Sequence, residues 1–227
     1  MQPYFYPYIG YFQLINYVDK FVVYDDVNFI KGGWINRNRI LINGRPHFIN
    51  AQLISASSNK LINEINLSPQ PKWKKKLLKS IRQNYIKAPH FEEVFPVIQN
   101  GISRNSDSLS CYLRDCIFDI LNLLEISTQI TVSSSLYNNS DLSASERVMD
   151  ICRKENAHSY VNAIGGRHLY NKKIFSTNGI ELFFLRSKPI RYAHFTENFV
   201  PNLSIIDVLM HLGTKKTKAI LTDFEII

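Results

Sequence analysis

Several features that would restrict the function of this protein are scarce in its sequence. There are three cysteines in 227 residues, without CxxC spacing, which argues against a disulfide framework and fits reduced thiols. No apolar run approaches the roughly 18 residues of a membrane-spanning helix. The first residues do not form a charged segment followed by an apolar one, as a secretory signal does. We therefore expect a cytoplasmic protein that is not inserted in a membrane.

Common catalytic signatures are missing as well. The six histidines show no HExxH pattern and no cluster with cysteine, so we expect no bound metal. There is no GxSxG nucleophile motif, and no dinucleotide or P-loop motif is complete. We predict no cofactor, and a protein that binds a ligand without catalysing a reaction remains one of the hypotheses.

The composition is that of a globular protein, with 45% hydrophobic and 20% charged residues. The length fits a single domain, residues 1–227. The net charge of +8 is concentrated in residues 72–87, which hold seven Lys or Arg and no acid, so +1 is left for the rest of the chain. This segment is either a solvated helix face or a docking surface for an acidic partner. With one basic helix and no recognised nucleic-acid motif, we expect no specific DNA binding.

Hydrophobic periodicity predicts a mixed α/β chain. A short helix over 9–18 precedes a buried strand at 21–24. Asn43-Gly44 between two apolar segments predicts a β-hairpin over 35–53, because Asn-Gly favours a type I′ turn. A strand at 62–67 leads into a helical insert at about 72–125, with helices at 72–86, 91–102 and 108–124.

The last third has the pattern of an α/β unit. The spacing of Ser143 and Glu146 is that of a capping box at the start of a helix. A strand at 159–164, a Gly165-Gly166 turn, a helix at 168–177 and a strand at 181–185 predict a βαβ unit. Terminal helices are expected at 203–212 and 215–221. The predicted fold is a three-layer sheet with helices on both faces, nucleotide-binding-like, with a hairpin excursion and the helical insert.

Two carboxylates and an arginine-rich strand are the leading candidates for chemistry. Asp25 and Asp26 follow a buried strand, and ligands of parallel sheets bind outside the carboxyl ends of the strands. One of them is predicted to be a general base or a ribose-hydroxyl acceptor, the alternative being turn formation. Arg37 and Arg39 alternate along a strand and share a face that suits phosphate or carboxylate. The alternative for these arginines is structural pairing with Asp25 or Asp26.

Weaker candidates come from a glycine turn, the aromatic start of the chain and two histidines. Gly165-Gly166 before a helix could expose backbone N–H groups to an anion, or could be a tight turn only. Residues 2–12 hold six aromatics, two prolines and a glycine, which suits either stacking on a sugar or base or a role in the core. His168 and His194 are candidate bases that could equally be structural.

Five segments carry a resemblance to a known family. They are Gln2-Pro-Tyr-Phe-Tyr-Pro-Tyr-Ile-Gly-Tyr-Phe12, Tyr24-Asp-Asp-Val27, Trp34-Ile-Asn-Arg-Asn38, Asn162-Ala-Ile-Gly-Gly166 with Leu169-Tyr170, and Pro201-Asn-Leu-Ser-Ile-Ile-Asp-Val-Leu-Met210. Together they resemble the WbqC-like family, which is found among genes for O-antigen and other bacterial surface polysaccharides. Relatives usually carry a short apolar strand before the Gln-Pro motif, whereas this sequence begins at Met1, and many have Gln in place of His194.

The resemblance implies an acyl- or aminoacyltransferase that modifies a nucleotide-linked amino sugar. Asp25 or Asp26 would deprotonate the sugar ammonium, with His194 as a further candidate, and Arg37 would hold the diphosphate. The basic helix would dock an acidic acyl-carrier protein or an aminoacyl-tRNA as donor. Substrate contacts are expected from Gln2, Tyr4, Tyr8, Tyr11, Asn36, Arg37, Asn38, Gly165, Gly166, Tyr170, Ser204 and Asp207.

A looser similarity joins the start of the chain to the first βα unit of nucleotidylyltransferases. Tyr8 and Tyr11 stand where that family has its phosphate-contacting histidine pair, so adenylyl transfer is not the leading expectation. ATP-dependent ligation is kept as a third hypothesis.

Overall fold

The elements of the fold are small and numerous. The computed structural model spans residues 1–227, and the description below applies to residues 1–193, 195 and 199–227. In chain order the elements are α1 (Ile9–Tyr17), β1 (Lys20–Val22), β2 (Arg37–Ile42), β3 (Arg45–Asn50), β4 (Leu53–Ile54), η1 (Ile62–Glu64), β5 (Asn66–Leu67), α2 (Lys72–Tyr85), α3 (Phe91–Ser103), α4 (Leu109–Leu123), β6 (Gln129–Thr131), η2 (Ser134–Tyr137), α5 (Ala144–Lys154), β7 (Ser159–Ala163), η3 (Ile164–Leu169), α6 (Lys172–Thr177), β8 (Glu181–Ser187), α7 (Ile205–Ala219), η4 (Ile220–Thr222) and β9 (Phe224–Ile226).

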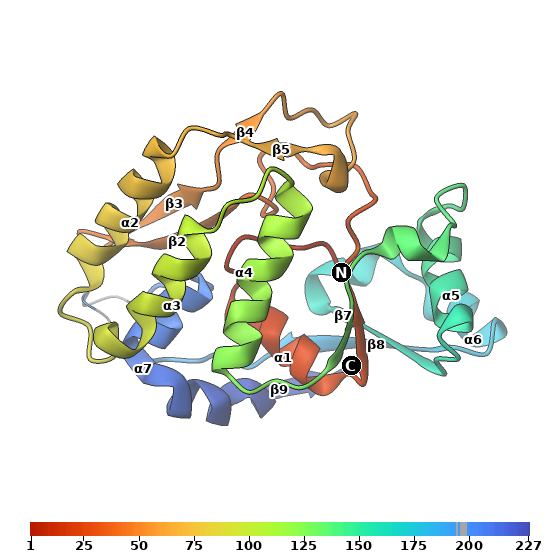
Figure 1. The fold of residues 1–227 in the computed structure, drawn as a ribbon. Coiled ribbons are helices and arrows are strands. Elements are labelled where there is room, and N and C mark those ends of the chain that lie inside the picture. The colour runs from red at the N-terminus through yellow and green to blue at the C-terminus, as the bar shows by residue number, and fades with distance from the viewer. Residues whose placement is uncertain (194, 196–198) are drawn as a thin grey trace.

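The strands within the described residues pair into small sheets. β1 is parallel to β6, β2 and β3 form an antiparallel hairpin, and β4 pairs with β5. In the remaining sheet β7 is parallel to β8, which is antiparallel to β9. The chain is therefore mixed α/β, as predicted, and its two parallel pairs lie among helices in Figure 1.

The hairpin forms where the sequence predicts it. Asn43 and Gly44 both have positive φ angles, 50° and 72°, as a type I′ turn requires. Helix α2 holds the hairpin, because the Tyr85 hydroxyl accepts from the Leu41 N–H at 2.9 Å and the Asn84 side chain accepts from the Asn43 N–H at 2.9 Å. The outer face of the hairpin is left for other contacts.

The predicted helical segment contains α2, α3 and α4. The apolar stripe expected on α2 is buried: Trp73, Leu77, Ile81 and Tyr85. Ser108 caps α4 as predicted, its hydroxyl accepting from the Cys111 N–H at 3.4 Å. In Figure 1 these helices cover one side of the molecule, while α5 and α6 lie at the other side.

Some elements differ from the prediction. The expected strand at 62–67 is the 3-10 helix η1 followed by the two-residue strand β5. The helix expected at 168–177 begins only at Lys172, after the 3-10 helix η3. Ser143 does not form the predicted capping box, because its hydroxyl donates to Glu146 at 2.6 Å and it makes no cap bond to the backbone. By contrast, the break expected between the two terminal helices at 203–212 and 215–221 is confirmed, because Gly213 within α7 has non-helical angles, φ 71° and ψ 174°.

The buried apolar side chains form two clusters among the described residues. The larger joins α1, the hairpin, α2 to α4 and α7. The smaller lies between α5, α6 and β8 and consists of Val148, Met149, Cys152, Phe175, Ile180, Leu182 and Phe184. The segment that follows β1 contacts α5 through the Asp26–Arg147 ion pair.

Candidate functional site

Asp25 lies just beyond β1, at the carboxyl end of the parallel β1–β6 pair, as predicted. It is 3% exposed. Its carboxylate accepts from the Ser133 hydroxyl at 2.6 Å, from the Ser134 N–H at 3.2 Å and from the Ser110 hydroxyl. Most of the roughly four acceptor positions of this carboxylate are therefore occupied by protein donors.

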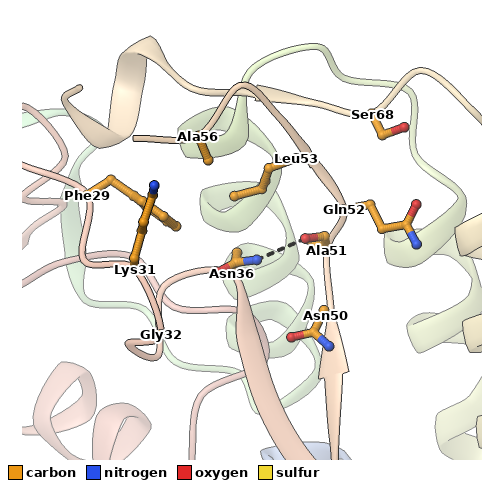
Figure 2. A pocket seen from close by; sticks show the side chains of 10 residues that line it. All are labelled: Phe29, Lys31, Gly32, Asn36, Asn50, Ala51, Gln52, Leu53, Ala56 and Ser68. Carbon is orange, nitrogen blue, oxygen red and sulfur yellow. Dashed lines mark hydrogen bonds between the residues drawn. The ribbon is translucent and has the colours of Figure 1, made fainter. Parts of the chain in front are cut away.

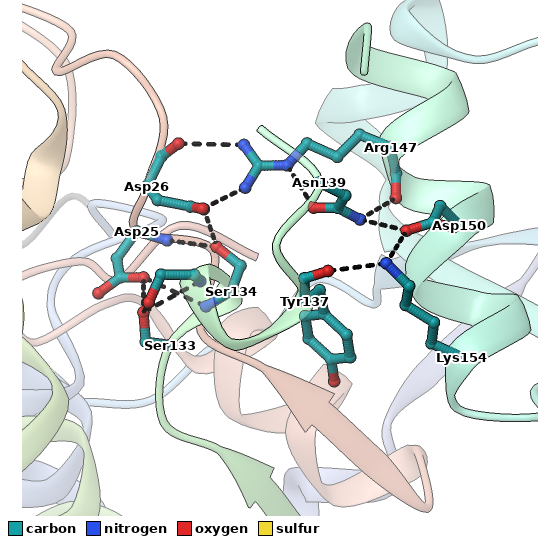
Figure 3. A network of polar contacts seen from close by, with 10 residues as sticks. Asp25, Asp26, Ser133, Ser134, Tyr137, Asn139, Arg147, Asp150 and Lys154 are labelled. Carbon is teal, nitrogen blue, oxygen red and sulfur yellow. Dashed lines mark hydrogen bonds and ion pairs between the residues drawn. The ribbon is translucent and has the colours of Figure 1, made fainter. Parts of the chain in front are cut away.

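Asp26 has its own partners (Figure 3). Its carboxylate forms an ion pair with Arg147 and accepts from the Ser134 hydroxyl. A second guanidinium nitrogen of Arg147 donates to the Asp26 backbone carbonyl at 3.0 Å. The side chains of the pair are only 5% and 8% exposed, so the two charges compensate each other within the protein. The predicted alternative, a hairpin arginine paired with Asp25 or Asp26, is wrong, because Arg147 of α5 is the partner.

The network extends from Arg147 along α5. Arg147 Nε donates to Asn139 Oδ1 at 3.0 Å, and the Asn139 amide donates to Asp150 at 2.7 Å. Lys154 then pairs with Asp150 at 2.8 Å and donates to the Tyr137 carbonyl at 2.7 Å. Hydrogen bonds from Lys154 and Asn139 lower the pKa of Asp150. This chain of contacts fixes the position of Asp26 from one side (Figure 3).

The other end of α5 is tied to β1 by a second carboxylate. Glu155 pairs with Lys20 and accepts from the Tyr137 hydroxyl. Hydrogen bonds from Lys20 and Tyr137 lower the pKa of Glu155. The pKa of Tyr137 is raised to about 12, mainly by burial and secondly by its hydrogen bond to Glu155. The start of β1 and the residues after it are thus both attached to α5.

A cavity of about 480 Å³ opens beside Asp26, and we call it the acidic cavity. Its lining residues are Asp26, Leu61, Asn63, Glu64, Ser135, Asn138, Asn139 and Ser140. The amide oxygen of Asn63 is buried and has no hydrogen-bond donor within the described part of the chain. Carboxylate and amide oxygens along this wall suit a ligand that carries N–H and O–H groups.

The aromatic residues at the start of the chain mainly fill the core. Tyr11 is fully buried, packs on Phe12 and Phe21, and donates its hydroxyl to the Gln2 carbonyl at 3.0 Å. Tyr4 and Tyr8 are partly buried, and burial raises the pKa of both phenols. Contact with a ligand is therefore sterically open to Tyr4 and Tyr8 but closed to Tyr11.

Asn36, Arg37 and Asn38 lie at the start of the hairpin. Asn38 is 4% exposed and donates to the Tyr6 carbonyl at 2.7 Å, which holds the N-terminal loop. Asn36 donates to the Ala51 carbonyl at 3.0 Å. Arg37 Nε donates to the Gly33 carbonyl at 2.8 Å, so Arg37 contacts its own loop and not the two aspartates.

Ser204 and Asp207 fasten α7 to the rest of the larger cluster. The Ser204 hydroxyl donates to the Tyr6 carbonyl at 2.7 Å. Asp207 is fully buried and accepts from the hydroxyls of Tyr85 at 2.5 Å and Tyr192 at 2.8 Å. The pKa of both tyrosines is raised, mainly by burial and secondly by the nearby charge of Asp207. Neither Ser204 nor Asp207 lines the acidic cavity.

The glycine turn lies in the smaller part of the molecule. Gly165 and Gly166 belong to η3, a six-residue 3-10 helix, so they do not begin an α-helix as predicted. A side chain at Gly166 would contact the Asn162 amide at 3.0 Å. Tyr170 packs on Tyr160 and Phe175 with ring centroids 5.6 Å and 5.7 Å apart. His168 is exposed on η3, and His194 falls outside the described residues.

Comparison with known proteins confirms the resemblance drawn from the motifs. The sequence matches the WbqC-like protein family over residues 2–219. The chain belongs to the WbqC-like family. A Mycobacterium tuberculosis protein, "Uncharacterized protein Rv1507c", is 28% identical over 212 residues, which cover 92% of this chain and 90% of that protein. No solved structure matches the chain significantly.

Two further observations bear on what this WbqC-like protein can bind. No helix in the described residues is both long and apolar enough to cross a bilayer. Within the same residues, no group of three or more His, Cys, Asp or Glu side chains converges as metal ligands would. The side chains that line the acidic cavity carry carboxylate, amide and hydroxyl groups.

Sequence reasoning missed Arg147, Ser134 and Asn63 in this WbqC-like protein. Arg147 could have been noticed, because it stands four residues before the buried Ile151 on the apolar stripe of α5, where a charge needs a partner. The run Ser133-Ser-Ser135 directly after a strand was a second signal, since its hydroxyls meet both aspartates. Asn63 left no comparable trace in the sequence.

Proposed function

We propose that this WbqC-like protein transfers an acyl or aminoacyl group to the amine of a nucleotide-linked amino sugar during assembly of a bacterial surface polysaccharide such as O-antigen. The observation that carries the proposal is the Asp26 carboxylate, which is held by Arg147 and Ser134 at the wall of the acidic cavity. The reaction is expected in the cytoplasm. The predicted three-layer, nucleotide-binding-like arrangement is part of the proposal and is supported by the two parallel strand pairs.

The cavity wall suits an amine that arrives as an ammonium ion. Asp26 uses two acceptor positions for Ser134 and Arg147, which leaves others for a ligand N–H. The Asn63 oxygen and the Glu64 carboxylate supply further acceptors. Asp25 meets three protein donors and does not line the cavity, so we assign it the role of positioning the loop.

The chemical step follows from this arrangement. Asp26 accepts a proton from the ammonium, the free amine attacks the donor carbonyl, and a C–N amide bond forms as the donor's ester or thioester bond breaks. The attacking nitrogen loses a second proton, which the departing alkoxide or thiolate takes up, and the proton on Asp26 is released to solvent. A positioned base typically contributes about 10²–10⁴ in rate. A protein thiol is not needed, and burial raises the pKa of Cys116 to about 12 and of Cys152 to about 11, which keeps them unreactive.

The donor is proposed to dock on α2. Its exposed cations include Lys75, Lys76, Lys79 and Arg82, and no ion pair with them occurs in the described residues. A one-sided positive surface attracts an acidic acyl-carrier protein or an aminoacyl-tRNA. Both donors carry the activated carbonyl that the reaction requires.

A second candidate function is binding of the same sugar without catalysis. The observation in its favour is that both aspartates already receive hydrogen bonds from the protein, as structural carboxylates do. ATP-dependent ligation is the third candidate and predicts ATP binding that depends on Arg37 or the Gly165-Gly166 turn. Turnover of an amino sugar without ATP would exclude both.

The experiment begins with a thermal-shift screen of UDP- and dTDP-linked amino sugars. A ligand at 100 times its Kd should stabilise the protein by about 2.7 kcal/mol. Any sugar that binds is then tested for turnover with acyl-coenzyme A, acyl-carrier protein and aminoacyl-tRNA. We expect Asp26→Asn to lower kcat by about 10²-fold or more, and full turnover by this variant would refute the assignment.

Asn63→Leu provides a variant that keeps the ion pair. The Asn63 oxygen has no protein donor, so its loss removes no such bond and should weaken amino-sugar binding while the fold is retained. Asn105→Leu, at an exposed position outside the cavity, is the matched control. If Asn63→Leu and Asn105→Leu bind the sugar equally well, the acidic cavity is not the amine site.

A further inference from the structure

A second cavity, of about 430 Å³, lies at the open end of the β2–β3 hairpin (Figure 2), and we call it the basic cavity. Its lining residues are Phe29, Lys31, Gly32, Asn36, Asn50, Ala51, Gln52, Leu53, Ala56 and Ser68. They include three side-chain amides, a hydroxyl and an ammonium group but no carboxylate. In Figure 2 the Asn36 and Asn50 side chains lie at the start of β2 and the end of β3.

An arginine–aromatic ladder, formed by Trp34, Arg37, Arg39 and Phe48, adjoins this cavity. The strand register places Arg37 opposite Asn50 and Arg39 opposite Phe48, so these residues share the outer face of the hairpin. Arg37 lies 4.3 Å from the Phe48 ring and Arg39 lies 5.5 Å from the Trp34 ring. Trp34 and Phe48 remain 44% and 47% exposed, which leaves aromatic surface for a ligand.

The ladder is connected to the basic cavity through Gly32. Arg37 donates to the carbonyl of Gly32, which lines the cavity, and to that of Gly33 at 2.8 Å. Asn50 belongs both to the cavity lining and to the outer face of the hairpin. A ligand could therefore contact the cavity and the ladder at the same time.

The positive charges here have no counter-ion in the described residues. Lys31, Arg37 and Arg39 form no ion pair there. Arg39 Nε is buried and has no acceptor, which is unusual because nearly all buried polar groups are hydrogen-bonded. Stacking of the arginines on aromatic rings does not satisfy that N–H. The combination indicates a ligand that brings anionic oxygens and a planar ring.

We propose that the ladder and the basic cavity bind a nucleoside diphosphate. Its base stacks on Trp34 or Phe48, its phosphates meet Arg37, Arg39 and Lys31, and a group attached to the phosphates contacts the amides of the cavity. The volume suits one small molecule. This inference deepens the proposed function by naming the site of the nucleotide half of the substrate, and it rests on that function only for the identity of the attached sugar.

The site has a built-in reporter. The chain has two tryptophans, and Trp34 is exposed whereas Trp73 is 4% exposed. We expect UDP or dTDP to quench the tryptophan emission of the wild-type protein and to release heat in calorimetry. Trp34→Phe should lose the quenching, because the remaining tryptophan, Trp73, is only 4% exposed. Arg39→Gln should weaken binding about tenfold, and Lys215→Gln, at an exposed position on α7, should not change it.

Several outcomes would overturn the inference. These are the absence of heat and quenching with millimolar UDP and dTDP, equal affinity of wild type and Arg39→Gln, or much tighter binding of a single-stranded oligonucleotide than of a nucleotide. The two proposals fail separately. Nucleotide binding at the ladder without amino-sugar turnover refutes the transferase only, whereas turnover that is indifferent to Arg39→Gln and Trp34→Ala refutes the nucleotide site only.

Discussion

The acidic and basic cavities have opposite charge, although one short loop contributes to both. Asp26 faces the first and Phe29 faces the second, and three extended residues span at most about 10 Å. The acidic cavity offers carboxylate and amide oxygens, whereas the basic cavity offers the Lys31 ammonium and amide N–H donors, with the ladder arginines beside it. A ligand with an ammonium group at one end and a diphosphate at the other would match this difference, and an amino-sugar nucleotide has both.

The cavities also differ in how deeply their charged groups are embedded. Asp26 and Arg147 are almost completely buried and join the segment after β1 to α5. The ladder lies on the outer face of a hairpin and exposes nearly half of each aromatic ring. We therefore expect the charged residues at the acidic cavity to contribute to the stability of the fold as well as to ligand binding. The charged residues of the ladder should contribute to ligand binding alone.

The largest expected effect is on stability. Arg147→Met leaves Asp26 buried without its partner, so the free energy of unfolding should fall by about 3–5 kcal/mol. Arg39→Met, at the ladder, should change it by about 1 kcal/mol or less. Urea unfolding of both variants measures this contrast, and equal losses would mean that the two regions are not embedded differently.

A double variant tests the cause of that loss. Asp26→Leu combined with Arg147→Met removes both charges, and it should be more stable than Arg147→Met alone because no uncompensated charge stays buried. If the double variant is the less stable of the two, then the loss in Arg147→Met comes from packing rather than from an unpaired carboxylate.

A medium effect is expected on ligand preference. Lys31→Glu in the basic cavity should weaken UDP binding about tenfold, or about 1.4 kcal/mol, since it replaces attraction of the phosphates by repulsion. Glu64→Lys in the acidic cavity should leave UDP binding unchanged and weaken binding of an amino sugar. Calorimetry of each variant with each ligand gives the full comparison, and a uniform loss in both variants would show that the cavities do not discriminate.

Local sequence patterns predicted the parts of the fold that depend on neighbouring residues. The Asn43-Gly44 turn and the apolar stripe of α2 follow from backbone conformation and helical period, and both are confirmed. The prediction of a strand at 62–67 is wrong. Ile62, Ile65 and Leu67 are all buried, and this spacing matches neither the alternation of a strand nor the stripe of a helix. At Gly165-Gly166 the paired glycines predict a turn before an α-helix, whereas the structure has a 3-10 helix there.

The candidate sites were predictable only in part, because their partners are distant in sequence. The placement of Asp25 and Asp26 beyond a parallel strand is confirmed, as is the shared face of Arg37 and Arg39. Arg147, however, is 121 residues from Asp26, and no local pattern encodes such a pairing. The place of Phe48 in the ladder depends on the register of the hairpin, which local sequence patterns do not specify.

The smallest expected effect concerns acid. Hydrogen bonds from Lys20 and Tyr137 lower the pKa of Glu155 below its usual 4.5, so this carboxylate stabilises the fold above that pH, and its contribution is lost as the pH falls through the lowered pKa. The difference in Tm between wild type and Glu155→Gln should be constant from pH 7 to about pH 5.5 and should shrink towards pH 3.

The control for acid sensitivity is Glu181→Gln, at an exposed position of β8 outside the network. Because Lys20 and Glu155 are partly exposed, 29% and 21%, the difference at neutral pH should be about 1 kcal/mol or less. UDP binding at the ladder should be equal in the two variants, since the network belongs to the acidic side of the loop. If Glu155→Gln instead weakens UDP binding, the two cavities are coupled through β1 and cannot be treated as independent halves of one site.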